Sequence, residues 1–102
     1  NCRMTWLLAR KKVAMKLELF SVPNDKNAEL IKEFLIKNNI KFNEIITDDI
    51  NLLREVVQGY LPNKISLLRI KRSHSIQVIG GYNEHFLNQL VNDIIKYKPR
   101  LE

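Results

Sequence analysis

The segment "SVPNDKNAEL", residues 21–30, contains three polar side chains of types that act at helix N-termini. Asn24, Asp25 and Asn27 follow an apolar run that predicts a strand and precede a pattern that predicts a helix. Backbone N–H groups at a helix N-terminus can bind an anion, and Asn or Asp side chains can accept hydrogen bonds from the same groups. The segment is therefore either a binding site for a ligand or partner, or a helix cap. The cap is favoured, because these residue types are common there regardless of function.

A second group of candidate residues is basic and lies around a predicted hairpin. The segment 56–83 has no acidic residue, and its positive side chains are Lys64, Arg69, Lys71 and Arg72. Such a segment can attract an acidic partner or a phosphate backbone. In a strand, however, Arg69 and Lys71 share a face that Lys64 and Arg72 do not. The favoured interpretation is a solvated hairpin edge whose charges discourage aggregation. Nucleic-acid binding is not expected, because no surface aromatic residues interleave with the basic residues.

Few residues of the chain suit metal binding or nucleophilic catalysis. Cys2 is the one cysteine, and His74 and His85 are far apart in sequence. No Cys-x-x-Cys pair, Gly-rich phosphate loop or nucleophilic serine motif is present. We therefore expect no metal site, no cofactor, no internal disulfide and no catalytic residue.

The net charge of +6 is unevenly distributed over the 102 residues. Five of the 17 basic residues lie in the first 16 positions, where no acidic residue occurs, so the rest holds 12 basic and 11 acidic side chains. The chain is 45% hydrophobic, which suffices for one compact core. No run approaches the ~18 apolar residues of a membrane span, so we expect a soluble cytoplasmic protein without membrane association. The oligomeric state is left open.

Hydrophobic periodicity predicts the elements that position these residues. Residues 1–14 show no clear period and are interpreted as a flexible extension, so the folded domain is expected at 15–102. The terminal Leu-Glu is given no functional role. Alternating apolar residues predict strands, and helical spacing predicts helices that end at Asn38, Gly59 and Pro99. The strands are expected at 15–22, 40–46, 64–70 and 75–81, and the helices at 26–38, 47–59 and 83–98.

The order β-α-β-α-β-β-α predicts an α/β fold with a four-stranded mixed sheet flanked by helices. This order resembles the thioredoxin-like superfamily. The first half is similar to a glutaredoxin in its strand, "SVPN", helix and "NNIKFNEIITDD", and "IGGYNE" is similar to the segment before the last glutaredoxin helix. In that register the two family cysteines fall at Asp25 and Ala28. Because neither a carboxylate nor a methyl group can attack sulfur, thiol–disulfide exchange is not expected.

The second half departs from the glutaredoxin pattern. The cis proline that glutaredoxins carry before their hairpin corresponds to Ile65 or Pro62. The sequence leaves open whether the 64–65 or the 61–62 peptide is cis. The long hairpin "KISLLRIKRSHSIQVIGG" and the cysteine-free "NDKN" loop are similar to KaiB-type clock proteins. That resemblance implies binding to a protein partner.

The resemblance also implies that three separate segments form one surface. These are the loop 22–28, the segment before Ile65, and the turn residues Gly80, Gly81, Tyr82 and Asn83. The two glycines either present backbone amides to a carboxylate, as the similar glutaredoxin segment does for glutathione, or only permit the turn, which is favoured. We expect a non-catalytic module that binds a protein. Two alternatives stay open: a degenerate glutathione-binding redox protein, and a nucleic-acid-associated factor that uses the basic hairpin.

Overall fold

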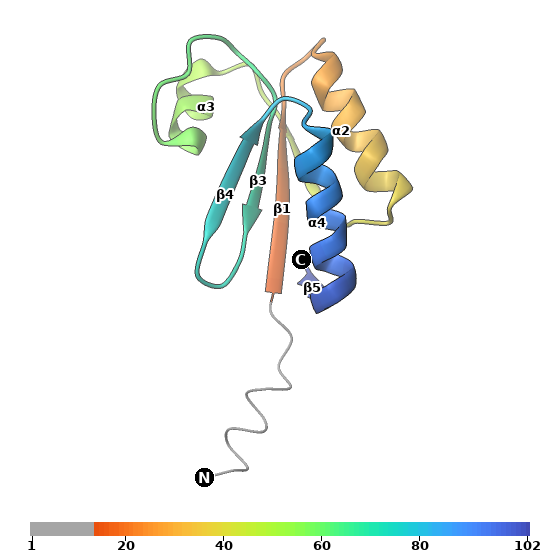
Figure 1. The fold of residues 1–102 in the computed structure, drawn as a ribbon. Coiled ribbons are helices and arrows are strands. Elements are labelled where there is room, and N and C mark those ends of the chain that lie inside the picture. The colour runs from red at the N-terminus through yellow and green to blue at the C-terminus, as the bar shows by residue number, and fades with distance from the viewer. Residues whose placement is uncertain (1–13) are drawn as a thin grey trace.

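The structure is a computed structural model that describes residues 14–102. The elements follow one another as β1 (Ala14–Ser21), α2 (Lys26–Lys37), β2 (Asn43–Ile46), α3 (Ile50–Val57), β3 (Leu67–Lys71), β4 (Ile76–Gly80), α4 (Glu84–Tyr97) and β5 (Arg100–Leu101) (Figure 1). The predicted order β-α-β-α-β-β-α is confirmed, and β5 is an additional strand. Residues 1–13 of the expected extension lie outside the described residues, and Ala14 is the first residue of β1.

The four longer strands form a mixed sheet in the order β2-β1-β3-β4. β1 and β2 are parallel because α2 connects them as a crossover. β1 pairs with β3, and β3 with β4, in antiparallel registers. This mixed α/β sheet is consistent with the thioredoxin-like arrangement that the sequence predicts.

The C-terminal strand β5 makes the sheet five-stranded. It pairs in parallel with the start of β1, where Ala14 lies opposite Arg100 and Met15 opposite Leu101. The backbone N–H of Glu102 donates to the carbonyl oxygen of Met15 at 2.9 Å, and Leu101 packs against the buried core. β5 was not predicted, because a two-residue strand carries no alternating pattern.

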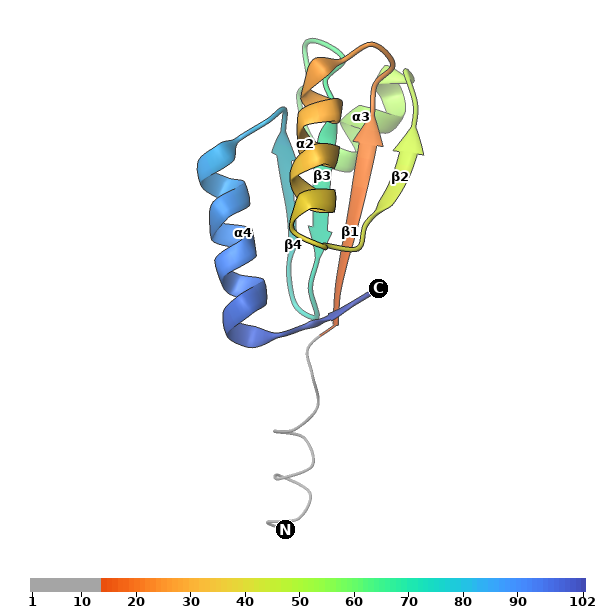
Figure 2. The same cartoon turned by 90° about the vertical axis from the view of Figure 1, so that its right-hand side faces the viewer.

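Alternation along β1 divides the core between the two faces of the sheet. Leu17 and Leu19 are fully buried on the face covered by α2 and α4. Phe20 lies on the opposite face, where it packs in a second cluster with Leu53 and Val56 of α3. The helices therefore lie on both sides of the sheet, with α2 in front and α3 behind it in Figure 2. With only eight residues, α3 covers one end of its face and leaves the other end open (Figure 1).

Side-chain caps and left-handed residues end the helices. Asp25, Asp49 and Asn83 are the N-caps of α2, α3 and α4, because each side chain accepts a backbone N–H of the first turn. The predicted end of α3 at Gly59 is wrong by one or two residues, since Gln58 adopts the left-handed conformation with φ 56°.

No cis peptide bond occurs within residues 14–102, so the bonds preceding Ile65 and Pro62 are both trans.

We expect the substitution Leu101→Ala to lower the free energy of unfolding by about 1–2 kcal/mol, because it removes a partly buried side chain from the core. Chemical denaturation measures the change. Arg100→Ala is the control, since Arg100 makes an exposed ion pair with Glu102 and its loss should cost less than about 0.5 kcal/mol. Equal effects of the two substitutions would show that β5 does not stabilise the core through Leu101.

Candidate functional site

The three segments that the resemblance brings together do meet in the structure, at the end of the sheet where α2 begins. The Asp25 carboxylate joins two of them. Its Oδ1 accepts hydrogen bonds from the backbone N–H and the side-chain amide of Asn27, each at 3.0 Å. Its Oδ2 accepts the backbone N–H of Ser66 at 2.9 Å. One carboxylate thus caps α2 and also holds the segment that leads into β3.

The third segment is attached through Asn27 and Ser66. The side-chain oxygen of Asn27 accepts the backbone N–H of Tyr82 at 3.3 Å. The backbone N–H of Gly81 donates to the carbonyl oxygen of Ser66 at 2.9 Å. We call these five residues, Asp25, Asn27, Ser66, Gly81 and Tyr82, the Asp25 network. Its hydrogen bonds connect segments that lie far apart in the sequence.

Packing and backbone geometry restrict the network further. Gly81 has φ +71°, and a Cβ there would lie 3.2 Å from Cδ1 of Ile65, so both conformation and space favour glycine. Ser66 is completely buried, and its hydroxyl accepts the backbone N–H of Val22 at 2.9 Å. The sequence analysis did not identify Ser66. In the sequence, Ser66 stands out only by its position directly after Ile65, because a single serine in a β-rich run belongs to no recognisable motif.

The electrostatics of Asp25 suit a permanent hydrogen-bond acceptor. Partial burial raises the pKa of Asp25, but the hydrogen bonds from Ser66 and Asn27 together lower it by more. Its pKa therefore lies below the ordinary value of 3.8, and the group is ionised at neutral pH. No buried side-chain nitrogen or oxygen within residues 14–102 lacks a hydrogen-bond partner.

The remaining predicted residues lie around this network rather than in it. Asn24 is exposed at the loop tip with φ 67°. Ala28 is buried in the first turn of α2. Asn83 caps α4 by accepting the backbone N–H of Phe86 at 3.0 Å, and Gly80 is the exposed last residue of β4. Of the three residues for which a helix cap was the favoured interpretation, Asp25 is the N-cap of α2. Its side chain also accepts a hydrogen bond from Ser66 in a second segment.

A small hollow lies beside the Asp25 network, between the loop and the end of β2. Glu44 on its wall accepts the Ser21 hydroxyl at 2.7 Å and pairs with the Lys32 ammonium at 2.9 Å. The hydrogen bonds from Ser21 and Lys32 hold the pKa of Glu44 below its ordinary value, although burial opposes them. The cavity volume is about 120 Å³, well below the roughly 300–1,000 Å³ of typical ligand pockets. Ile46, 68% exposed, lies at its rim.

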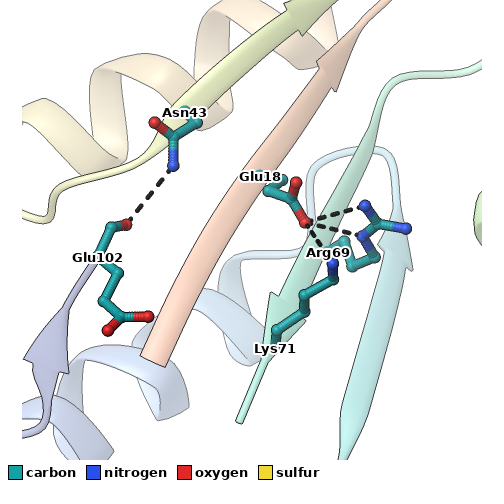
Figure 3. A network of polar contacts seen from close by, with 5 residues as sticks. All are labelled: Glu18, Asn43, Arg69, Lys71 and Glu102. Atoms are coloured by element: carbon teal, nitrogen blue, oxygen red, sulfur yellow. Dashed lines mark hydrogen bonds and ion pairs between the residues drawn. The ribbon is translucent and has the colours of Figure 1, made fainter. Parts of the chain in front are cut away.

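The basic residues of the hairpin are partly neutralised by an acid from β1 (Figure 3). Nε and Nη2 of Arg69 both lie 2.9 Å from Oε1 of Glu18, and Nζ of Lys71 lies 3.7 Å from the same atom. The Arg69 guanidinium also lies 5.0 Å from the centre of the Phe20 ring. Arg69 and Lys71 share a sheet face as predicted, whereas Lys64 is exposed in the loop before β3.

The interpretation of Arg69 as part of a solvated edge is therefore wrong. Its partner was missed because Glu18 is 51 residues away in sequence and only the β1–β3 register brings the two together. Glu18 is only 8% exposed. Burial raises its pKa, but the hydrogen bond and charge of Arg69, helped by Lys71 and Lys16, lower it by more, so the pKa is below its ordinary value.

Within residues 14–102, no three His, Cys, Asp or Glu side chains are grouped so that they could hold a metal ion. Cys2 lies outside the described residues. In the part of the chain that the structure describes, no helix has both the length and the apolar character to cross a membrane. Comparisons with protein-family models, curated proteins and solved structures gave no significant match to the chain.

We expect Asp25→Asn to lower the free energy of unfolding by about 1–3 kcal/mol at pH 7, because it removes charge-assisted hydrogen bonds to partly buried donors. The folded-state pKa of Asp25 is lowered. Its contribution is therefore complete above the unfolded-state pKa and is lost as the pH falls through the folded-state value. The difference between wild type and variant should shrink in acid below pH ~4.

Denaturation at a series of pH values measures this difference. Glu18 and Glu44 also titrate in acid, but they are present in both proteins and cancel in the comparison. Asp48→Asn is the control, because Asp48 is exposed before α3 and its substitution should change stability by less than about 0.5 kcal/mol. A stability gap for Asp25→Asn that stays constant into acid would contradict the assigned role of the carboxylate.

Proposed function

We propose that the chain is a non-catalytic module of the thioredoxin-like superfamily that acts by binding a protein partner. In this proposal the chain is glutaredoxin-like in its first half and KaiB-like in its second half. The observation that carries it is the Asp25 network. The position that a reactive cysteine would occupy holds a carboxylate whose oxygens are engaged by Asn27 and Ser66.

Catalysis at this end of the sheet is disfavoured, because its polar groups already form hydrogen bonds within the chain. The backbone N–H groups of Ser66, Gly81 and Tyr82 all donate to acceptors of the chain itself. A peptide-like ligand such as glutathione needs free donors of this kind for its carboxylate and amide groups. Binding it would require breaking bonds that already satisfy partly buried groups, which is costly.

A protein partner suits the exposed features around the network better than a small molecule. The exposed side chains Pro23, Asn24 and Ile46 surround a hollow of about 120 Å³. Protein contact surfaces have an apolar centre within a polar rim, and Ile46 beside Pro23 and Asn24 fits that arrangement. The Asp25 network holds these loops together without using the exposed side chains. We propose that this surface, centred on Ile46, contacts the partner in the cytoplasm.

We expect Ile46→Asp to reduce partner retention by about tenfold or more if Ile46 is a buried anchor of the complex. The measurement is quantitative affinity capture from extracts of the source cell with wild-type and variant protein. Ile36→Asp on α2 is a matched control, because Ile36 is 65% exposed and Ile46 is 68% exposed. Retention that is reduced equally by both substitutions, or by neither, would contradict the proposed surface.

Reduced glutathione should leave the amide resonances of the Asp25 network unchanged at millimolar concentration, because the relevant N–H groups are already bonded. A titration monitored by two-dimensional amide NMR tests this expectation. Saturable shifts confined to residues 24–28, 65–66 and 80–83 would instead favour the degenerate glutathione-binding protein. That result would overturn the choice of a protein partner over a small molecule.

A further inference from the structure

β4 is an edge strand that its own residues do not protect. It ends the strand order β2-β1-β3-β4 and, among the described strands, pairs only with β3. Its sequence is IQVIG, without a charged residue or a proline. Proteins commonly place such residues on edge strands to prevent pairing with other chains. The outer edge of β4 therefore offers backbone N–H and C=O groups to an additional strand.

A hollow lies beside this edge. It is on the face of the sheet that α3 covers only at one end (Figure 1). Its volume is about 260 Å³. It is lined by Ile76 and Val78 of β4, by Arg69 of β3, and by Val56, Val57 and Gln58 at the end of α3. Ile76 is 60% exposed. Because alternate side chains of a strand point to the same face, every second side chain of a segment paired with β4 would lie on the side of this hollow, where an apolar one could contact Ile76 and Val78.

The same face carries an excess of positive charge toward the hairpin turn. The register places Lys16 opposite Lys71, and Lys71 opposite Ile76. Arg72 follows at this end of the sheet, but its Nη1 donates to the Gln77 side chain at 3.0 Å, and Gln77 alternates with Ile76 and lies on the opposite face. Arg69 and Lys71 both contact the carboxylate of Glu18, and the charge of Lys16 also lowers its pKa, so three basic residues of this face share one carboxylate. Glu102, which lines a neighbouring hollow with Lys16, Lys71 and Arg72, is paired with Arg100.

We infer that β4 and the adjacent hollow bind an extended acidic segment of a partner protein. The segment adds as a strand along β4 and places an apolar side chain over the hollow beside Ile76. It sets alternate acidic side chains beside Lys71 on one face and Arg72 on the other. Strand addition of this kind takes affinity from backbone hydrogen bonds and specificity from side-chain pockets. The inference rests on the proposed function in treating the chain as a protein-binding module, but it assigns a surface separate from Ile46.

Charge distinguishes this occupant from a second copy of the chain. A second copy pairing through β4 would supply no carboxylate, because the segment 56–83 contains neither Asp nor Glu. A nucleic acid would meet the positive charge but not the apolar wall or the strand edge, and single-stranded binding normally uses exposed aromatic rings for stacking. An acidic peptide satisfies the edge, the hollow and the charge together.

The probe is the capped peptide TVTVDED, whose acidic C-terminal half would lie at the Ile76 end when it pairs antiparallel with β4. The control peptide is TVTVKKK, which has the same N-terminal half, TVTV, and a basic C-terminal half. Two-dimensional amide NMR of the whole chain should show saturable shifts centred on residues 76–80 with the acidic peptide. Contacts between peptide amides and β4 amides in filtered NOE spectra should show the added strand. The basic peptide should bind at least about tenfold more weakly.

Two variants separate strand addition from simple charge attraction. Joint reversal of Lys71→Glu and Arg72→Glu should weaken binding by about tenfold or more. Joint reversal of Lys37→Glu and Lys41→Glu, which changes the net charge equally at exposed positions elsewhere, should have a small effect. Ile76→Lys adds a positive charge but also protects the edge, so it should weaken binding of the acidic peptide if pairing with β4 is the mechanism.

Five results would overturn the inference, four of them from the peptide experiments. These four are no shifts at millimolar acidic peptide, equal binding of both peptides, tighter binding of the acidic peptide by Ile76→Lys, and the same β4 shifts arising from dimerisation without peptide. Stronger binding of a single-stranded oligonucleotide at the same residues would assign the surface to nucleic acid and would also overturn it. None of these results bears on Ile46, so the proposed function would stand or fall separately in the capture experiment.

Discussion

The carboxylate of Asp25 is the interaction on which the end of the sheet depends. It lies at the N-terminus of α2, where the helix dipole favours a negative charge. It also accepts the backbone N–H of Ser66, a completely buried residue directly before β3. A neutral cap could satisfy the first turn of α2, but the second oxygen is needed for the Ser66 amide. The placement of the loop 22–28 relative to the start of β3 therefore follows from one ionised side chain with two acceptors.

This arrangement gives a physical reason to expect binding rather than catalysis. A reactive cysteine at a helix N-terminus needs access to its substrate and free donors nearby. Here the chain supplies its own acceptors to those donors, through Asp25, Asn27 and the Ser66 carbonyl. The network stabilises the exposed residues around it in one geometry. Pre-organised loops lose less conformational entropy on binding, which favours a fixed contact surface for another protein.

Local patterns in the sequence predicted the order of elements, because β1 alternates apolar residues and the helices carry apolar faces with clear N-caps. Asp25 as the cap of α2 was also predictable. Its bond to Ser66 was not, since no local pattern records which amide a carboxylate reaches 41 residues away. The pairing of Glu18 with Arg69 depends in the same way on strand register. β5 was not predicted, because it is stabilised by pairing with Met15 and by packing against the core, and its own two residues carry no pattern.

Amide hydrogen exchange at Ser66 tests the central claim most directly, because it reports whether the Asp25 carboxylate holds this N–H in solution. If the network is formed as described, the Ser66 amide exchanges far more slowly than the amides of Asn63 and Lys64 in the preceding exposed loop. Asp25→Ala should then remove most of that protection, while the protection of Leu68 in β3 should fall by no more than the loss of global stability. Ser66 exchange as fast as that of Asn63 in the wild-type chain would contradict the account.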